Sequence, residues 1–215
     1  QVQSHLVRDL SDAATDVRSA MLRNVQALQA LQAMGRDPET WAKQAERLLR
    51  EHREWLRLEW RDTQMHVLVA SDTPYRVPPF ARLGRENAQT EVALACANAR
   101  RLSSPSYASS YFLPQVSGLG MEVMELCLPH VSSGQLTGYV VATYSLSEIL
   151  AGLVGPQLTR GQEISFTEAD GTRLALHGNG RRGNRLFTAQ QLLDLPGNTV
   201  VLRMDSWHGA PDVVP

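Results

Sequence analysis

The sequence predicts an α+β fold in which a long N-terminal helix precedes two antiparallel sheets, the second smaller than the first. Apolar residues recur every three or four positions near the N-terminus and at every second position from Leu58 onward. The order strand, turn, strand, helix, strand then occurs twice. With 215 residues, 43% of them hydrophobic, the chain is long and apolar enough to bury a core.

The charge balance and the cysteine count limit the function classes. The chain has 21 Lys and Arg against 22 Asp and Glu, a formal net charge of −1, so we expect no nucleic-acid partner. Cys96 and Cys127 are too few for a tetrahedral zinc site, and the histidines form no HxH or HxxxH pair. We therefore expect no metal and no cofactor. Nucleophile motifs such as GxSxG do not occur, and we expect no catalysis.

Residues 4–34 are expected to form one long amphipathic helix. Neither Pro nor Gly interrupts this stretch, and at about 1.5 Å per residue the helix would span roughly 45 Å. Gly35 is a natural stop, and Asp37 followed by Pro38 supplies the N-cap and first turn of a second helix, which runs to Trp55. The positions with helical spacing are Leu6, Leu10, Ala13, Val17, Ala20, Met21, Val25, Leu28 and Leu31.

The first sheet is expected to contain five strands, with a helix between the second and the third. A polar turn at residues 62–64 joins the first two strands, and a proline-rich loop over residues 74–80 precedes an Ala-rich helix over Asn87–Leu102. The expected strands are Leu58–Arg61, Met65–Ala70, Tyr107–Leu113, Met121–Leu128 and Thr137–Tyr144.

The second sheet is expected to follow a short helix. Ser145 and Glu148 form a capping box, which predicts a helix over Leu146–Val154. A hairpin with its turn at residues 169–171 comes next, then a helical turn over Thr188–Leu195 and a last strand. The expected strands are Ile164–Phe166, Thr172–Leu176 and Thr199–Met204.

Two motifs have competing interpretations. Gly178, Gly180 and Gly183 spell the dinucleotide fingerprint GxGxxG, but no strand–helix–strand unit surrounds it, so we interpret it as a mobile surface loop. Cys96 and Cys127 could form a disulfide in an oxidising compartment. Their small and apolar neighbours favour the other interpretation, that both are buried, inert thiols.

The segment from Arg100 to Tyr144 carries the side chains that could hold a ligand. Alternate residues of a strand share one face, which would align Tyr107, Ser109 and Tyr111. An arginine beside tyrosines can bind a carboxylate and cover an apolar body, so we expect a small organic acid, aromatic acids among them. A glutamate in the same cavity would instead favour an amino-bearing ligand. The candidate ligand-binding residues are Arg100, Arg101, Tyr107, Ser109, Tyr111, Glu122, Tyr139 and Thr143.

Both ends of the chain indicate a piece of a longer protein. The first residues already read as helix without an initiating Met, and residues 213–215 end on a rise in hydropathy. No run of about 18 or more apolar residues lies between the ends. We expect membrane spans in the flanking segments, which would make the chain a periplasmic domain of an inner-membrane protein.

In this order of elements the chain resembles the extracytoplasmic tandem-PAS sensor domains, also called double CACHE or PDC domains, of bacterial membrane-bound histidine kinases. Among these kinases, the chain is most similar in its order of elements to the sensors of four-carbon dicarboxylates. Residues 74–78 do not match the run that those sensors place before their pocket, so dicarboxylate specificity is not implied. The resemblance is carried by the helix Leu6–Leu31, the hairpin ending in His66–Ser71, the strand Gly138–Tyr144 running into Ser145–Glu148, and the hairpin Ile164–Gly171.

The resemblance implies a helical stalk (residues 1–57), a membrane-distal PAS-like ligand-sensing domain (58–145), a linker helix (146–156) and a smaller membrane-proximal PAS-like domain (157–215). It implies a two-component sensor histidine kinase as the parent, with the long helix in a homodimer in which Asn24 could fix the register. A chemoreceptor or a diguanylate cyclase could carry the same module. Alternatives from other classes are a stand-alone soluble binding protein or enzyme, and a domain whose PAS-like core is filled by side chains and whose signal comes from a partner protein.

Overall fold

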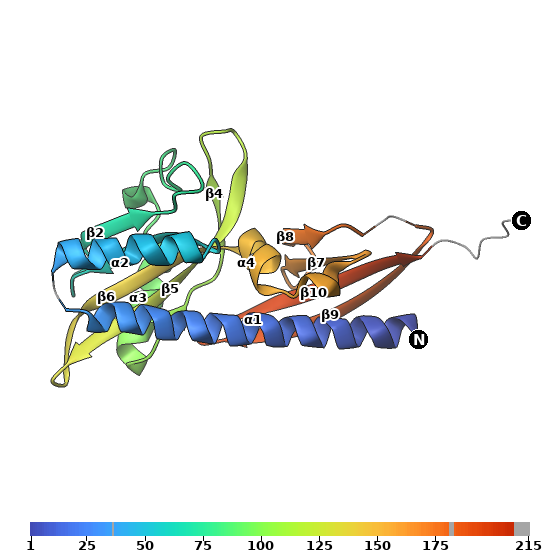
Figure 1. Ribbon diagram of the computed structural model, residues 1–215, viewed down its shortest axis with the longest axis horizontal. Helices are drawn as coiled ribbons and strands as arrows, with labels where there is room; N and C mark the ends of the chain where they lie inside the picture. The colour runs from blue at the N-terminus through green and yellow to red at the C-terminus, as the bar shows by residue number, and fades with distance from the viewer. Residues whose placement is uncertain (36, 181–182, 209–215) are drawn as a thin grey trace, which may run out of the picture. The chain divides into compact units, whose positions relative to one another are not determined.

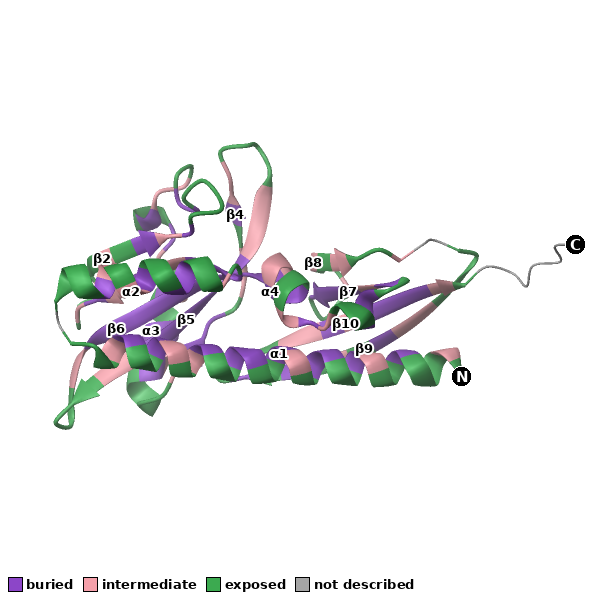
Figure 2. Ribbon diagram, viewed as in Figure 1, coloured by how far each residue is buried: buried purple, intermediate pink, exposed green. Residues whose placement is uncertain are grey.

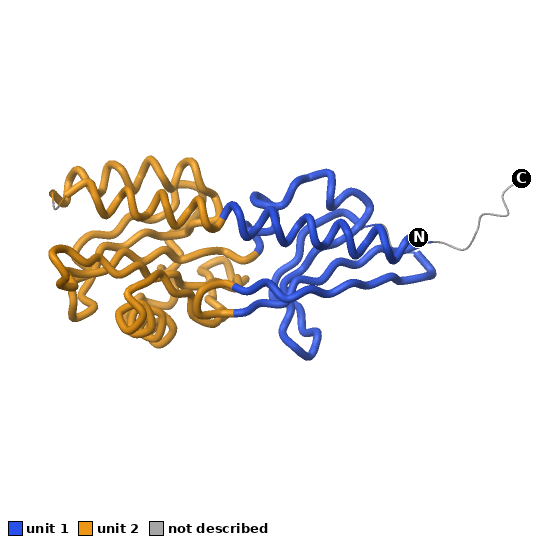
Figure 3. Tube along the Cα trace, turned by 90° about the horizontal axis from the view of Figure 1, so that it is seen from below, with its two compact units in different colours: residues 1–20, 147–194, 199–215 blue, residues 21–146, 195–198 orange. Residues whose placement is uncertain are grey.

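The computed structural model describes residues 1–35, 37–180 and 183–208. These residues group into two compact units, shown in two colours in Figure 3. The six-stranded unit takes the described residues of 21–146 and 195–198, and the four-stranded unit takes those of 1–20, 147–194 and 199–215. The expected α+β class is confirmed, with a long first helix and a smaller second sheet.

The two N-terminal helices begin where the sequence predicts, but the second was expected to run to Trp55 and ends at Glu51, because Trp55 is the first residue of a strand and pairs with Tyr144. Helix α1 covers Val2–Ala33, and Gly35 follows it with φ of 100°, a left-handed conformation that glycine adopts without strain. Helix α2 covers Pro38–Glu51, and the Asp37 carboxylate accepts a hydrogen bond from the Thr40 backbone N–H at 3.1 Å. No described helix is long and apolar enough to cross a membrane.

The six-stranded sheet has the strand order β2-β1-β6-β5-β3, with β4 also paired to β5. The sequence predicted one strand over Tyr107–Leu113, which was wrong: residues 108–110 interrupt it, and Ala108 N–H donates to the Glu125 carbonyl at 3.0 Å outside the regular ladder. The strands are β1 (Trp55–Arg61), β2 (Val67–Asp72), β3 (Ser106–Tyr107), β4 (Tyr111–Pro114), β5 (Gly120–Ser132) and β6 (Gln135–Ser145).

The two faces of this sheet carry different partners (Figures 1 and 2). On one face, Tyr144 OH accepts from Asn24 of α1 at 3.2 Å, and the Trp41 ring of α2 lies 6.3 Å from that of Trp60. Tyr139, two strand positions from Val141, points to the other face. There it packs against helix α3 (Thr90–Leu102). The same face is also covered by the irregular residues 73–84 and by the short 3-10 helix η1 (Arg85–Asn87), which follows them.

The four-stranded unit has the strand order β8-β7-β10-β9. The helical turn expected over Thr188–Leu195 was wrong, because these residues belong to β9, where Leu193 and Leu195 are both buried with the period of a strand. The elements are α4 (Leu146–Leu153), η2 (Pro156–Thr159), β7 (Gln162–Thr167), β8 (Arg173–Gly178), β9 (Arg185–Leu195) and β10 (Asn198–His208).

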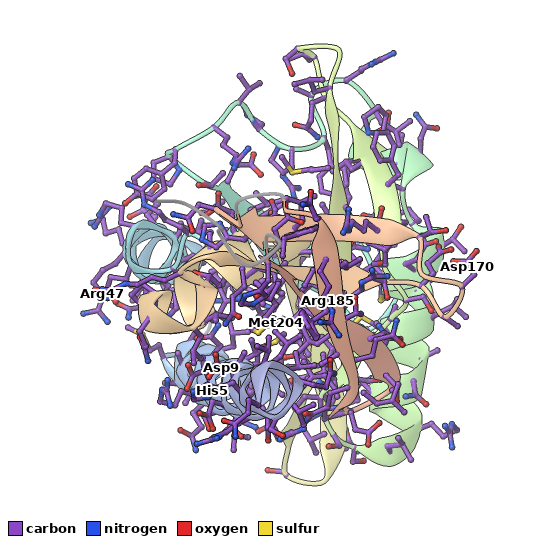
Figure 4. All side chains as sticks on the ribbon, turned by 90° about the vertical axis from the view of Figure 1, so that its right-hand side faces the viewer. His5, Asp9, Arg47, Asp170, Arg185 and Met204 are labelled. Carbon is purple, nitrogen blue, oxygen red and sulfur yellow. A yellow bond between two sulfur atoms is a disulfide. The ribbon has the colours of Figure 1, made fainter. Side chains whose placement is uncertain are left out.

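Polar contacts hold the first part of α1 within this unit. Gln162 Nε2 donates to Asp9 at 2.9 Å, and the Gly155 backbone N–H donates to Asp16 at 3.0 Å. Met204, labelled in Figure 4 with Asp9, is fully buried on β10, where it pairs with the equally buried Ile164 of β7. The unit is therefore formed by residues from both ends of the described chain.

The glycine motif lies only partly within the described residues. Gly178 ends β8, and residues 181–182 lie outside the described residues, as do 213–215 at the C-terminal end. A Cβ on Gly178 would lie 2.4 Å from the Gln162 carbonyl oxygen, so glycine is required there for strand packing.

The two cysteines form a disulfide between α3 and β5, which corrects the prediction of inert thiols. The Cys96 and Cys127 Cα atoms are 5.1 Å apart, and both residues are buried in a cluster with Val92, Tyr139 and Val141. Their small and apolar neighbours are the same for a buried thiol and for a buried disulfide. The sequence did not show that α3 packs against β5, which brings the two cysteines together.

Loss of this disulfide should lower the free energy of unfolding by about 3 to 4 kcal/mol, because the bond joins residues 31 positions apart and so restricts the unfolded chain. Urea denaturation of the wild type with and without dithiothreitol measures the effect. The Cys96→Ala/Cys127→Ala variant is the control and should not respond to the reductant. Equal wild-type midpoints after complete reduction would contradict the prediction.

Candidate ligand-binding site

Strands β1, β5 and β6 place polar residues on the α3 face of the six-stranded sheet. Glu59 lies between Arg57 and Arg61 at alternate positions of β1, so all three point to one face. Glu125 of β5 is paired in register with Thr143 of β6, and the Thr143 hydroxyl donates to its carboxylate at 2.6 Å. Glu59, Arg61, Glu125 and Thr143 are fully buried, so their charges and hydroxyls need partners inside the protein.

Arg85, which lies in η1, is the shared partner of Glu59 and Glu125. Its guanidinium makes five hydrogen bonds, as many as it has N–H donors. Two go to Glu59 at 3.0 and 3.2 Å, two to Glu125 at 2.6 and 3.3 Å, and one to the Ala88 carbonyl at 3.0 Å. The Phe80 ring covers it, with its centroid 4.4 Å from the guanidinium carbon.

Other side chains donate further hydrogen bonds to the carboxylates of Glu59 and Glu125. Glu125 also accepts from Tyr111 OH at 2.6 Å, and Glu59 accepts from Arg57 and Arg61 at 2.7 and 2.8 Å. One further pair, Arg57 with Asp72 at 3.1 Å, extends the network to β2. We call the six charged residues the Arg85 cluster: Arg57, Glu59, Arg61, Asp72, Arg85 and Glu125.

Burial and charge act in opposite directions on the ionisation of this cluster. Burial by itself raises the pKa of Glu59, but the charge and hydrogen bonds of Arg85, with the charges of Arg61 and Arg57, outweigh it and lower that pKa from 4.5 to about 2. For Tyr111, burial and the neighbouring Glu125 carboxylate both raise the pKa well above the ordinary 10.0. At neutral pH the Glu59 carboxylate is therefore charged, and the Tyr111 phenol stays a neutral hydrogen-bond donor.

Two of the candidate residues from the sequence, Tyr111 and Thr143, meet at Glu125. Glu122 does not join them: it accepts a hydrogen bond from Ser110 at 2.7 Å. It lies an odd number of residues from Glu125, so the strand directs it to the opposite face. The acidic residue that the sequence analysis looked for in this region is thus three positions further along β5.

The other candidates lie elsewhere. Arg100 and Arg101 are exposed near the C-terminal end of α3, where Arg101 donates to Asn98 at 2.5 Å, and Ser109 is exposed between β3 and β4. Tyr107 and Tyr139 are buried, the first with its ring 6.1 Å from Tyr144. The convergence of arginines and tyrosines expected from the sequence is therefore not observed, because the break at residues 108–110 separates Tyr107 from Tyr111.

The sequence analysis missed Glu59, Arg85 and Glu125. A signal was present for the glutamates, since each is flanked by large apolar residues of a strand, where an unpaired charge is costly. Glu59 has Arg57 and Arg61 two positions away on its own strand, but Glu125 has no Lys or Arg on its strand, so its cationic partner had to come from elsewhere in the chain. The signal for Arg85 was weak, because it lies in a loop region with Arg76 and Arg82 close by in sequence.

Two cavities lie outside the Arg85 cluster. A cavity of about 170 Å³ in the six-stranded unit is lined by Trp41, Trp60 and His130, among others, and Thr137 hydroxyl lies 3.0 Å from His130 Nδ1. An open groove of about 390 Å³ in the four-stranded unit is lined by residues that include His5 and Asp9, both labelled in Figure 4. Among the described residues, no group of three or more His, Cys, Asp or Glu could hold a metal ion.

Comparison with solved structures identifies the architecture. The ligand-binding domain of the Pseudomonas aeruginosa amino acid chemoreceptor PctC, in complex with GABA, matches 96% of this chain and 100% of its own with a TM-score of 0.60 and 13% identity. The corresponding domain of the Pseudomonas fluorescens chemoreceptor CtaA with L-alanine matches 96% and 97%, with a TM-score of 0.59 and 13% identity. The fold is that of a double CACHE sensor domain.

The double CACHE fold also occurs in proteins with other outputs. A domain of a sensory box/GGDEF family protein from Vibrio parahaemolyticus matches 95% of this chain and 96% of its own, with a TM-score of 0.54 and 11% identity. Comparison of the sequence with protein-family models and with curated proteins gives no match. The tandem-PAS resemblance stated from the sequence is thus confirmed at the level of the fold.

The lowered pKa of Glu59 predicts an acid-sensitive contribution to stability. Because the pKa is about 2 in the folded protein and about 4.5 when exposed, this contribution is complete above about pH 4.5 and is lost as the pH falls toward 2. Its size is on the order of 3 kcal/mol. Glu59→Gln should therefore unfold more easily than wild type at pH 7, and the difference should shrink from pH 5 to pH 3.

Urea denaturation at several pH values measures this convergence. Glu46→Gln, which removes an exposed carboxylate of α2, is the matched control and should follow the wild-type pH dependence. Parallel curves for Glu59→Gln and wild type down to pH 3 would contradict the assignment.

Proposed function

We propose that the chain is the periplasmic sensor domain of a membrane-anchored signalling protein and that its six-stranded unit senses a small molecule. The observation that carries the proposal is a complete binding arrangement for a charged group, built on buried strands of a double CACHE fold. Internal charges cost free energy to bury, and this arrangement concentrates them on the face beside an irregular segment. The PctC and CtaA domains described above are complexes with GABA and L-alanine.

The parent is proposed to be a two-component histidine kinase or a chemoreceptor, and the solved relatives described above favour the chemoreceptor as much as the kinase. The coding sequence on either side of the chain separates the two. Hydrophobic spans before Gln1 and after Pro215 followed by a kinase histidine box support the first, and a methyl-accepting signalling domain supports the second. An uninterrupted soluble reading frame would contradict a membrane-anchored sensor.

A second candidate function is recognition of a partner protein, and one observation favours it. Strand β4 and its connection to β5 expose large apolar side chains: Phe112 is 62% exposed, Val116 55% and Leu119 76%. Exposed apolar side chains that gather in one region are typical of a protein contact. In this alternative the Arg85 cluster would be structural. Leu119→Asp would then abolish signalling by the full-length parent, and small molecules would change the signal of neither form.

A hybrid receptor tests small-molecule sensing. The chain should replace the sensor domain of a chemoreceptor that has a double CACHE domain, and amino acids, amines and carboxylic acids are then tested by the change in swimming bias of cells. We expect at least one compound to change the output, and the same compound to raise the melting temperature of the purified domain. At 100 times its dissociation constant a ligand adds about 2.7 kcal/mol of stability. Silence in both measurements would overturn the proposal.

We also propose a weak parallel homodimer through α1. Val7 and Leu22 are 51% and 61% exposed on this helix, which leaves both available for contact with a second copy. Asn24 does not support the dimer as the sequence analysis expected, because it is buried and donates to Glu54 at 2.8 Å within the same chain. Apolar contact is therefore the proposed driving force.

Sedimentation at increasing concentration should show association of the wild-type domain that Leu22→Asp abolishes, because burying an unpaired carboxylate at the interface is unfavourable. Leu119→Asp, a matched change far from α1 in sequence, should not affect association. A strict monomer at millimolar concentration would contradict the dimer, provided that crosslinking of the membrane-anchored parent also finds none.

A further inference from the structure

We propose that Arg85 is a tethered occupant of a cation-binding site, and that a soluble ligand with a guanidino or primary amino group takes its place. The inference rests on the proposed sensor function and names the chemical class of its ligand. It differs from the organic acid expected from the sequence. It also gives the irregular segment over residues 73–84 a role in the response.

The surroundings of Arg85 meet every requirement of a guanidinium ion. Two carboxylates, Glu59 and Glu125, receive four of its hydrogen bonds, a backbone carbonyl receives the fifth, and the Phe80 ring covers one side. Tyr111 and Thr143 hold the Glu125 carboxylate in position through further hydrogen bonds. Apart from Phe80 and Ala88, these groups belong to strands of the sheet, so most of the site is independent of the segment that carries Arg85.

The charge of the cluster defines what can replace Arg85. With Arg85 present, three arginines face three carboxylates and the cluster is neutral. Without it, Arg57 and Arg61 face three carboxylates, and a net charge of −1 stays in a largely buried site. Leaving a buried charge without a partner is strongly unfavourable, so a cation must enter when Arg85 leaves. An organic acid would make the imbalance worse.

Arg85 is also the member of the central pairs that can leave. Glu59, Glu125 and Arg61 have side chains with no exposed surface, whereas the Arg85 side chain is 9% exposed and reachable from solvent. The three buried members are fixed in β1 and β5. Arg85 lies in a three-residue 3-10 helix that follows an irregular segment with three prolines, Pro74, Pro78 and Pro79. A short movement of this segment would therefore free the site without breaking the sheet.

The tether sets a condition on the ligand. An intramolecular group competes at an effective concentration in the millimolar range, so a bare guanidinium ion would not displace Arg85. A displacing ligand must make further contacts beyond its cationic group. Displacement would release Phe80 and Arg85 together, since the cation–π contact joins them, and would loosen residues 73–89.

The first experiment tests the site with the tethered group removed. Arg85→Ala should lower the melting temperature by about 10 °C, and millimolar methylguanidinium chloride should restore a large part of it in a saturable manner. Equal concentrations of urea or sodium chloride should not. Arg82→Ala, which removes an exposed arginine three residues away, is the matched control and should show neither the loss nor the rescue. Arg85→Ala/Glu125→Gln should not be rescued.

The second experiment tests exchange in the wild-type chain and does not depend on whether Arg85→Ala folds. Hydrogen exchange of residues 73–89 is measured with agmatine, putrescine and L-arginine at millimolar concentration. Faster exchange in this segment with at least one compound, and no acceleration in α2, supports displacement. Unchanged exchange with all three overturns the proposal, as does a folded Arg85→Ala that methylguanidinium does not stabilise. Rescue without any exchange in the wild type also overturns it, because the cluster is then a structural ion network.

Failure of this inference can be distinguished from failure of the proposed function. If the hybrid receptor responds to a compound, and Glu125→Gln leaves that response and its concentration dependence unchanged, the domain is a sensor but does not use this site. If the hybrid is silent toward all compounds while methylguanidinium still rescues Arg85→Ala, the cation site exists without small-molecule sensing.

Discussion

The fold depends on how buried charge is balanced on one face of the six-stranded sheet. Glu59 and Glu125 are fully buried on neighbouring parts of this face, and burying carboxylate groups there is costly without a guanidinium partner. Arg85 meets both from outside the sheet and donates two hydrogen bonds to each. The segment before Arg85 has little regular structure, so its path depends on these contacts, on Phe80, and on the hydrogen bonds of Tyr75 with Arg50 and of Pro79 and Arg82 with Gln115.

Much of the architecture could be predicted because its signals are local. The spacing of apolar residues defines α1, the Asp37-Pro38 pair defines the start of α2, and alternation defines β1, β5 and β6. The prediction failed over Thr188–Leu195, where a sequence compatible with a helix pairs as β9 with β10. Strand pairing is a long-range contact, and it outweighed the weak local preference.

The candidate site was less predictable because its partners are distant in sequence. Tyr111 and Thr143 were identified as polar residues of strands, yet the group that they both bind, Glu125, was not. Arg85 and Glu125 are 40 residues apart, and no spacing rule connects a loop arginine with a strand carboxylate. Balancing the buried charges of the predicted strands would have shown that a cation was missing, although not which arginine supplies it.

The disulfide has a consequence for how this face of the sheet can deform. Cys96 and Cys127 join the middle of α3 to β5 covalently. The disulfide therefore restrains the helix on one side of the Arg85 cluster. The opposite side is bounded by residues 73–84, which follow β2 in the chain and which no disulfide joins to the sheet. If a ligand replaces Arg85, the displacement should therefore be confined to residues 73–84 and leave α3 in place. In a reducing compartment both sides would yield, and the direction of the movement would be lost.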